Sequence, residues 1–317
     1  MSTTSPPSNP THHPRSKKTQ FIIDFMMGGT SGAIAKTICA PIERVKLLMQ
    51  NQATIEKLEG SKKYTGIVNC FSRVIKEEGF LALWRGNWAN VLRYFPTQAI
   101  NFSIKDYLNR LFCPFKAKDS PFKYFLGSLL AGGLAGSTSM IFVYPLDFAR
   151  TRLANDLGRN ASDRQFAGLS DCMKKIYKAD GTIGLYRGFQ ISVIGIFVYR
   201  AFYFGGYDTG KRLVFGEDDI SKHSRILKFF FAQFVVTTSE TLSYPLDTVR
   251  RRLMMQSGKQ EKMYAGTIDC FNKIYAKEGV SGFFKGNVSN IWRSVGSSLV
   301  LVLYDDLQIL MGVKKVH

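Results

Sequence analysis

The chain has few of the features that mark a secreted or metal-binding protein. Its five cysteines form no CxxC pair and no zinc-ligand spacing; they are Cys39, Cys70, Cys113, Cys172 and Cys270. A disulfide framework or a metal site is therefore not expected, and reduced, buried thiols are the simpler interpretation. Residues 1–20 also lack the apolar core of a signal peptide, although they include basic residues. We predict that residues 1–20 form a disordered polar tail.

Acidic residues are scarce as well. The 317 residues contain 43 Lys and Arg against 24 Asp and Glu, a net charge of +19, so anionic partners are expected: nucleic acid, anionic lipid or nucleotide. The basic residues are spread over loops and helix ends between apolar segments, which disfavours a nucleic-acid partner. The mean hydropathy of −0.06 argues against simple hydrophobic anchors and fits helices with one face toward lipid and one toward water.

A phosphate-binding loop is also missing. The stretch "GGTSGAIAKT", residues 28–37, is similar to one, but the pattern GxxxxGK[ST] requires glycine at Thr30 and at Ala35. No predicted strand precedes this stretch. An enzyme that uses a phosphate loop is therefore not supported, and we predict no catalytic residues.

Internal repetition is the strongest signal in the sequence. "APIERVKLL" at residue 40 recurs as "YPLDFARTR" at 144 and "YPLDTVRRR" at 244, so the chain consists of three copies of about 100 residues. Each copy continues with an aromatic-x-Gly turn and then with "EGFLALWRGN", "DGTIGLYRGF" or "EGVSGFFKGN". We place the copies at residues 21–118, 119–220 and 221–317.

Each copy is predicted to contain a long helix broken near its proline, a short amphipathic helix and a second long helix. The segments 21–40, 125–146 and 189–206 are apolar and long enough to cross about 30 Å of hydrocarbon, although Gly, Ser, Thr and an occasional charge interrupt them. The predicted fold class is therefore an all-α membrane protein made of three tandem repeats.

The repeated motif P-x-[DE]-x-x-[KR] predicts a ring of ion pairs. Its acid and base stand three residues apart and so share one face of a helix. Charges at membrane depth are tolerated when they are paired and turned inward. The predicted pairs join adjacent copies: Glu43 with Arg150, Asp147 with Arg250, and Asp247 with Lys46. Pairing of each acid with the base on its own helix is the alternative, and threefold recurrence weighs against it.

Three copies of this motif, each followed by [DE]-G-x5-[KR]-G, resemble the mitochondrial carrier family over about residues 20–312. "PIERVKLL", "RYFPTQAINF", "YRAFYFGGYDTGK" and above all "RRRLMM" are similar to the branch of that family that exchanges ADP for ATP. This nucleotide-carrier signature consists here of Arg250, Arg251, Arg252, Leu253, Met254 and Met255. The branch has RRRMMM, and leucine for methionine at 253 conserves volume. The second copy also lacks the usual polar residue after Gly188.

The resemblance implies six tilted transmembrane helices and three short matrix helices around a central cavity, in the mitochondrial inner membrane. It implies electrogenic exchange of ADP for ATP by alternating access, driven by the membrane potential and carried out by a monomer without cofactor, metal or nucleic acid. The alternative is another carrier of the family, for coenzyme A, phosphate or another nucleotide.

Charges found in only one or two copies are expected to serve an asymmetric ligand. Four such cations lie in apolar spans, where each is costly unless it meets water or an anion, and arginine forks suit phosphates. Two tyrosines on the helix of Arg200 offer a face for a purine, although packing against neighbouring helices explains them equally well. The residues assigned to the substrate are Lys36, Arg93, Asn101, Gly195, Ile196, Tyr199, Arg200, Tyr203, Ser243, Arg251 and Arg293.

The three consecutive arginines receive different roles. Arg250 is a base of the ion-pair ring, and Arg252 is expected to meet acids or lipid headgroups. Arg251 stands where the other copies have Thr151 and Leu47, so we assign it to the nucleotide or to its steering. A solvated charge at a helix end is the alternative for Arg251.

Two gates follow from the resemblance. The matrix gate comprises Glu43, Lys46, Gln50, Asp147, Arg150, Asp247 and Arg250. Family members usually carry [FY]-[DE]-x-x-[KR] on each even-numbered helix, but only "YDTGK" is complete here, so one ionic pair, Asp106 with Lys211, is expected at the opposite end. This cytoplasmic gate comprises Asp106, Asp208, Lys211 and Asp305. Its weakness predicts a substrate-free carrier that rests open to the intermembrane space.

Cardiolipin is an expected structural lipid. Each short helix follows an aromatic-x-Gly turn and precedes "WRG", "YRG" or "FKG", and amides at helix N-termini can hold phosphates. The assigned residues are Gly66, Arg85, Gly86, Gly168, Arg187, Gly188, Gly266, Lys285 and Gly286.

Overall fold

The computed structural model describes residues 17–58, 63–114, 120–215 and 224–310, which are helices and loops without strands. The first copy contains α1 (Lys17–Asn51), α2 (Ile67–Glu78) and α3 (Asn87–Phe112). The second contains α4 (Pro121–Ala154), α5 (Leu169–Leu185) and α6 (Phe189–Phe215). The third contains α7 (Arg225–Met255), α8 (Thr267–Glu278) and α9 (Asn287–Leu310). The three predicted repeats thus have the same succession of helices.

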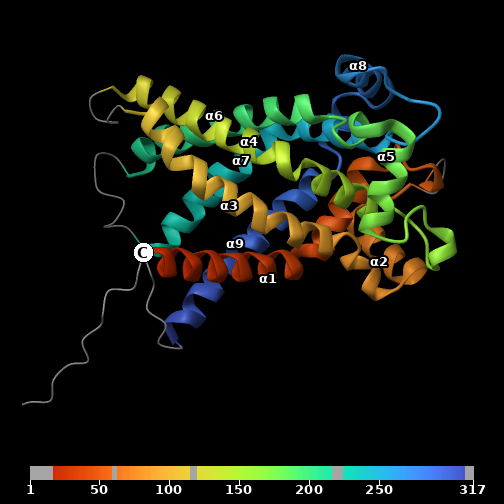
Figure 1. Ribbon diagram of the computed structural model, residues 1–317, viewed down its shortest axis with the longest axis horizontal. Helices are drawn as coiled ribbons and strands as arrows, with labels where there is room; N and C mark the ends of the chain where they lie inside the picture. Colours follow the sequence, from red (N-terminus) through yellow and green to blue (C-terminus); the bar gives the residue numbers. More distant parts are fainter. Residues whose placement is uncertain (1–16, 59–62, 115–119, 216–223, 311–317) are drawn as a thin grey trace, which may run out of the picture.

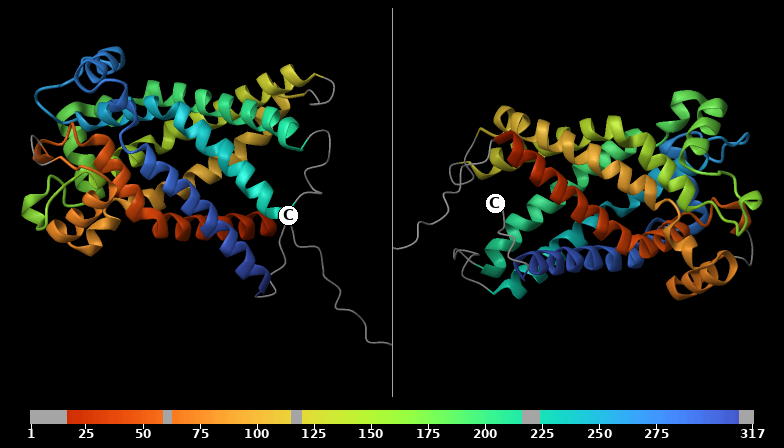
Figure 2. Two further views of the ribbon diagram at one scale, coloured as in Figure 1. Left: turned by 180° about the vertical axis from the view of Figure 1, so that it is seen from behind. Right: turned by 60° about the horizontal axis from the view of Figure 1, so that its bottom comes forward.

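The long helices form a closed ring in the order α1, α3, α4, α6, α7, α9, in which each helix contacts the next and α9 returns to α1. The helices α2, α5 and α8 lie together at one end of the ring, on the right in Figure 1, and Figure 2 shows the same arrangement from two other sides. We call this the short-helix end. The first long helices α1, α4 and α7 also contact one another. The ring therefore narrows where these three helices meet.

The helices differ from the sequence expectation in two places. Helices α1, α4 and α7 run through Pro41, Pro145 and Pro245 without interruption, so the predicted break near each proline is wrong. A proline has no backbone N–H to donate, so one helical hydrogen bond is missing, but the hydrogen bonds of the helix continue on both sides of it. Helix α1 also begins at Lys17, so residues 17–20, which the sequence places in the tail, are helical. Residues 1–16 of the predicted tail lie outside the described part of the chain.

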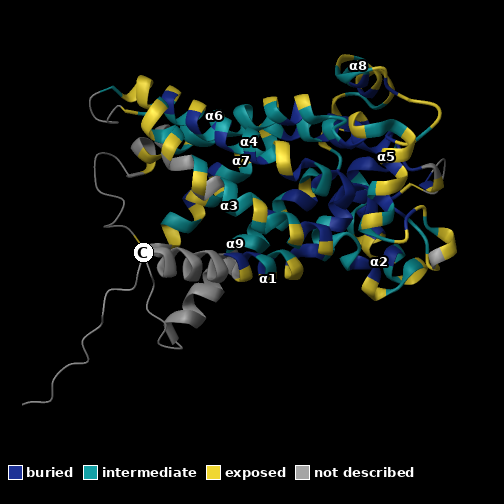
Figure 3. Cartoon of the chain, in the orientation of Figure 1, coloured by how far each residue is buried: buried dark blue, intermediate teal, exposed yellow. Residues whose placement is uncertain are grey.

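Two described helices are long and apolar enough to cross a bilayer by length and composition: α4, and residues Phe189–Tyr207 of α6. They contain the predicted spans 125–146 and 189–206. The predicted span 21–40 lies in α1, where the side chains of residues 21–28 are not among those described. Figure 3 shows that exposed residues recur along the outside of the ring, while buried residues are concentrated toward the short-helix end.

Each short helix packs on its own copy through a cysteine. Cys70, Cys172 and Cys270 are fully buried, and each belongs to a different apolar cluster at the short-helix end. Burial raises the pKa of each of these thiols to about 12, so they stay protonated at neutral pH. All five cysteines are free, and four of them are buried as predicted: Cys39, Cys70, Cys172 and Cys270. Cys113 is only half-buried, so the expectation of burial is wrong for that residue.

The loops after the short helices bind the copies to one another through glycine. Gly86, Gly188 and Gly286 have φ angles of 85°, 84° and 84°, where other residues are strained. A Cβ atom on Gly188 would lie 2.9 Å from the backbone oxygen of Arg250, and the other two glycines meet Arg150 and Lys46 in the same way. Each copy therefore rests directly on the backbone of the next at one residue of the ion-pair ring.

Replacement of Gly188 by alanine is expected to lower the melting temperature of the purified protein by several degrees. The left-handed backbone costs an alanine about 1–2 kcal/mol, and the contact with Arg250 adds to this. Gly168→Ala is the matched control, because Gly168 has extended backbone and a Cβ atom there would meet no described atom within 4 Å. Equal melting temperatures for the two variants in lipid-free detergent would contradict this account of Gly188.

Candidate substrate cavity and gate

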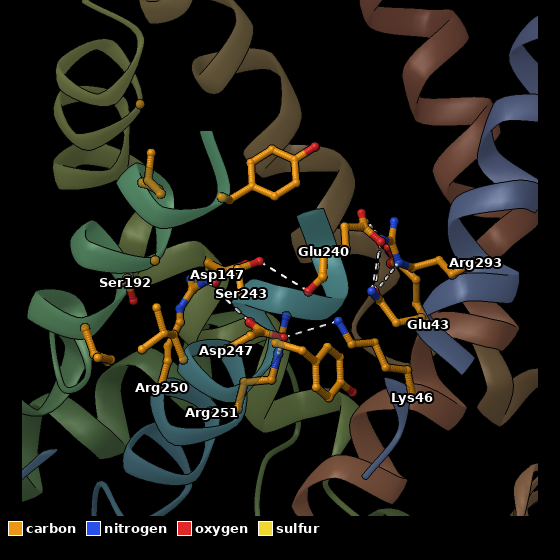
Figure 4. A pocket seen from close by; sticks show the side chains of 18 of the residues that line it. Glu43, Lys46, Asp147, Ser192, Glu240, Ser243, Asp247, Arg250, Arg251 and Arg293 are labelled. Atoms are coloured by element: carbon orange, nitrogen blue, oxygen red, sulfur yellow. Dashed lines mark hydrogen bonds and ion pairs between the residues drawn. The ribbon is translucent and has the colours of Figure 1, made fainter. Parts of the chain in front are cut away.

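A cavity of about 570 Å³ lies inside the ring and is lined by residues from all three copies. Figure 4 shows its charged side chains converging from different helices. Its described lining includes four carboxylates, Glu43, Asp147, Glu240 and Asp247. It also includes eight cations: Lys36, Lys46, Arg93, Arg150, Arg200, Arg250, Arg251 and Arg293. The cavity is thus strongly positive, as the sequence predicted.

The floor of the cavity is a ring of ion pairs between copies. Arg150 binds Glu43, Arg250 binds Asp147, and Lys46 Nζ lies 3.2 Å from Asp247 Oδ2. These are the three pairs predicted between adjacent copies, so the predicted pairing is confirmed. The contacts of Arg150 and Arg250 with the acid on their own helix are longer, at 4.0 and 3.9 Å. The ring closes the cavity on the side of the short helices.

Gln50 supports the same ring. Its Nε2 donates to Asp247 Oδ2 at 3.3 Å and to Thr248 Oγ1 at 3.0 Å, and the side chain is fully buried. Asp247 accepts this hydrogen bond from α1 and another from Arg251 of its own helix. An amide here adds a neutral bridge between the first and third copies, next to the Lys46–Asp247 pair.

Each of the three signature arginines binds a different carboxylate. Arg251 Nε lies 2.9 Å from Asp247, and its Nη1 donates to Thr151 at 3.2 Å. Because Arg251 is 8% exposed, the alternative of a solvated helix-end charge is wrong. Arg252 is 1% exposed and binds Glu278, so it meets an acid of its own copy. Arg251 lines the cavity, but a carboxylate already neutralises it, and its assignment to the nucleotide remains a prediction.

The apolar half of the signature holds the three copies together. Leu253 belongs to the apolar cluster of the third copy, Met254 to that of the second, and Met255 to that of the first. All three side chains are buried, with exposures of 4%, 0% and 6%. The end of α7 is therefore the point at which the three clusters meet. Leu253 sits in the cluster of its own copy, where leucine fills a volume close to that of methionine.

Two of the predicted substrate cations have no carboxylate within 4.0 Å among the described residues. Lys36 lies over the ring of Tyr94, with Nζ 5.5 Å from the centroid. The guanidinium of Arg200 lies against Gly132 and Gly136 of α4, where a larger residue would displace it. Both side chains line the cavity. They can therefore bind an anion without first breaking an ion pair.

The other two predicted substrate cations are already near carboxylates. Arg93 Nε lies 3.6 Å from Asp147 Oδ1, and Arg293 Nη2 lies 2.9 Å from Glu240 Oε1. Sequence reasoning did not assign Glu240 to the site. It also missed Asn90 and Asn290, which donate to Glu43 and Glu240. An N-x-x-R pattern, "NVLR" and "NIWR", recurs at these positions in the first and third copies and could have revealed both asparagines.

The second copy contributes an aromatic and apolar wall. Tyr199 and Tyr203 stack with centroids 6.0 Å apart, and both line the cavity with Ile196 and Gly195. Tyr203 also packs against the buried cluster on α7, as the packing interpretation expects. Its role as a face for a purine remains a prediction. Among the described atoms, a Cβ atom on Gly195 would meet only Leu246 within 4 Å, at 3.8 Å, which leaves room beside the backbone.

The remaining assigned residues fall in different places. Ser243 lines the cavity, and its hydroxyl donates to the backbone oxygen of Ser239. Lys211 is exposed on α6. The side chains of Asn101, Asp106, Asp208 and Asp305 lie outside the described residues. The cytoplasmic gate and the resting state that it implies therefore remain predictions.

The basic residues assigned to cardiolipin already have carboxylate partners. Arg85 binds Glu78, Arg187 lies 3.3 Å from Asp180, and Lys285 lies 2.6 Å from Glu278. Burial alone would raise the pKa of Glu278, but hydrogen bonds from Arg252 and Lys285 hold it below its ordinary value. These pairs and the packing of Gly86, Gly188 and Gly286 account for six of the assigned residues without a lipid. Gly66, Gly168 and Gly266 are different, because a Cβ atom at these positions would meet no described atom within 4 Å.

The architecture, with a ring of helices around a charged cavity, is that of a membrane transporter built from three repeats. The family described as "Mitochondrial carrier protein" matches residues 17–116, 122–218 and 221–315, and the chain belongs to this family of transporters. It is 56% identical over 292 residues to "Mitochondrial substrate carrier family protein ancA" of Dictyostelium discoideum, covering 92% of this chain and 94% of that protein. It is 53% identical over 286 residues to "ADP/ATP translocase 4" of Homo sapiens, covering 90% of both chains. It is 52% identical over 291 residues to human "ADP/ATP translocase 3", covering 91% and 97%.

A charge exchange between Glu43 and Arg150 tests the ion-pair ring. Either Glu43→Arg or Arg150→Glu alone leaves two like charges facing each other in a nearly buried site, at a cost of about 3–5 kcal/mol. The double variant restores opposite charges, so we expect its melting temperature to exceed that of both single variants, with a coupling energy of about 0.5–3 kcal/mol. A double variant less stable than the weaker single variant would show that this pair does not join the copies.

Proposed function

We propose that the chain exchanges ADP for ATP across the mitochondrial inner membrane by alternating access to the central cavity. The observation that carries this proposal is the combination of arginine-rich positive charge with an aromatic wall in one cavity. Lys36 and Arg200 lack a carboxylate partner among the described residues, whereas Tyr199 and Tyr203 present stacked rings nearby. Phosphates suit the first feature and a purine suits the second.

The relatives support the same substrate class. Those named ADP/ATP translocases are as similar to this chain, within a few per cent, as the relative named only as a substrate carrier. A carrier for another anionic metabolite, such as phosphate or coenzyme A, is the second candidate. Phosphate alone gives no reason for an aromatic wall, so a ligand that carries an adenine, as adenine nucleotides and coenzyme A do, is the better match to the cavity.

The ring of ion pairs supplies one of the two gates in this proposal. In the described conformation the pairs close the cavity toward the short helices, which we place on the matrix side. Entry of an anion brings negative charge close to Arg93, which already contacts Asp147, and thereby competes for the cations of the ring. Opening then requires the three pairs between copies to separate. ATP carries one more negative charge than ADP, so a membrane potential contributes about 2.3 kcal/mol per 100 mV to its export.

The decisive experiment is uptake of labelled ADP by liposomes that contain the purified protein. Vesicles preloaded with ADP or ATP are expected to take up label, whereas empty vesicles and those preloaded with AMP, GTP, phosphate or coenzyme A are not. Uptake driven by phosphate or coenzyme A, and not by ATP, would favour the second candidate function.

Arg93→Ala is expected to reduce ADP/ATP exchange at least about tenfold, because a charged hydrogen bond to phosphate contributes about 1.5–3 kcal/mol. The cardiolipin-dependent stability of the protein should be retained, since Arg93 lies in the cavity and not at the short helices. Lys76→Ala is the control, because Lys76 is an exposed cation on α2. Wild-type exchange rates in the Arg93 variant would remove this residue from the substrate site.

We further propose that cardiolipin binds at the N-termini of the short helices. Gly66, Gly168 and Gly266 cap α2, α5 and α8 without a side-chain hydrogen bond, in extended backbone that any residue can adopt. Neither backbone conformation nor packing against the described residues explains glycine at all three positions. Close approach of a phosphate to the amides of the first helical turn would explain it.

This proposal predicts that Gly168→Ala weakens lipid binding and leaves the lipid-free fold unchanged. The rise in melting temperature on addition of cardiolipin should be smaller for the variant than for the wild type, because a methyl group occupies the space of the headgroup. Phosphatidylcholine serves as the lipid control. An unchanged response to cardiolipin would contradict this placement.

A further inference from the structure

Glu240 is a carboxylate inside a cavity that is otherwise built for anions. Its Oε1 accepts a hydrogen bond from Arg293 Nη2 at 2.9 Å, and its Oε2 accepts one from Asn290 Nδ2 at 2.8 Å. Figure 4 shows Glu240, from α7, and Arg293, from α9, within the group of side chains that lines the cavity. The side chains of Arg293 and Glu240 are 20% and 21% exposed, so both remain in reach of a ligand.

The gate does not account for this pair. The carboxylates of the ion-pair ring are Glu43, Asp147 and Asp247, and each is bound by a cation of another copy. Glu240 stands seven residues before Asp247 on α7, about two helical turns farther from the short-helix end. It pairs within its own copy, with Arg293. Its negative charge therefore belongs to the substrate region of the cavity.

Comparison of the three copies shows what this charge changes. The first copy has Lys36 and Arg93 at the two equivalent positions, so both are cations. The second copy has Met140 and Gly195 and is neutral there. In the third copy the carboxylate of Glu240 cancels the charge of Arg293. The positive field at this level of the cavity is consequently strongest on the side of the first copy.

We infer that Glu240 is a specificity-determining residue that competes with substrate phosphate for Arg293. A phosphate that approaches Arg293 has to replace the carboxylate as its partner or to accept repulsion from it. This repulsion grows with the charge of the ligand, so it disfavours a triphosphate more than a diphosphate and a diphosphate more than a monophosphate. The identity of the substrate in this inference rests on the proposed function. The competition between Glu240 and phosphate for Arg293 rests only on the geometry of the cavity.

The test compares Glu240→Gln with the wild-type protein in liposomes. Glutamine keeps the size of the side chain and an oxygen that accepts from Arg293, but it removes the charge. We expect the KM for ATP to fall about two- to fivefold, the scale set by one partly exposed ion pair, with a smaller fall for ADP and the smallest effect on AMP binding measured by competition. Glu77→Gln is the matched control, because Glu77 is an exposed acid on α2 that pairs only with Arg73 four residues away in the described contacts.

The outcomes separate the inference from the proposed function. Equal changes for all three nucleotides, or unchanged KM ratios, would overturn the role of Glu240, since packing alone predicts no dependence on ligand charge. If the wild type exchanges no adenine nucleotide, the proposed function fails. Thermal stabilisation by pyrophosphate and tripolyphosphate then still tests whether Glu240 competes with phosphate for Arg293. For each ligand, the rise in melting temperature of Glu240→Gln is compared with that of the wild type. A gain over wild type that is larger with tripolyphosphate than with pyrophosphate supports the inference. A gain that is the same with both ligands overturns it. Should Glu240→Gln fail to fold, Glu240→Met, the residue of the second copy, is measured in its place.

Discussion

The structure depends on the pairing of charges between consecutive copies. A carboxylate or cation left alone among apolar helices is costly, and in the described contacts no copy pairs its gate acid at short range with its own gate base. Each copy therefore needs its neighbour, and three copies satisfy this need only as a closed ring. The glycine contacts Gly86 with Arg150, Gly188 with Arg250 and Gly286 with Lys46 follow the same cyclic order. Ion pairs and backbone packing thus enforce one arrangement.

The end of α7 joins this ring to the apolar core. Within six residues, 250–255, it supplies three arginines that pair with Asp147, Asp247 and Glu278. The next three side chains are apolar, and each belongs to a different one of the three clusters. A movement of α7 at this point would alter the packing of all three copies together. Such coupling is what a gate requires if its pairs are to open as a unit and not one at a time.

The part of the cavity beyond the ion-pair ring is not symmetric. The ion-pair ring has one pair at each junction between copies, because its partners stand at equivalent positions, whereas the lining of the cavity differs from copy to copy. The first copy presents two cations, the second an aromatic wall, and the third a neutralised arginine. A ligand with one charged end and one aromatic end would have a preferred orientation in such a cavity. The Glu240–Arg293 pair leaves the third copy with less positive charge than the first at this level.

The amino-acid sequence was enough to predict the threefold repeat, the all-helical class and the partners in the ion-pair ring, because residues at equivalent positions of a repeat must occupy equivalent places. It also located Lys36, Arg93, Arg200 and Arg293 by their lack of symmetry. The folded chain was needed to show that α1, α4 and α7 pass through their prolines, that Arg251 and Arg252 have Asp247 and Glu278 as partners, and that Met254 and Met255 enter the clusters of other copies. The partnership of Glu240 with Arg293 was equally invisible. Where partners do not repeat in every copy, the contacts of a side chain depend on the distances between helices, and a repeat pattern carries no information about those distances.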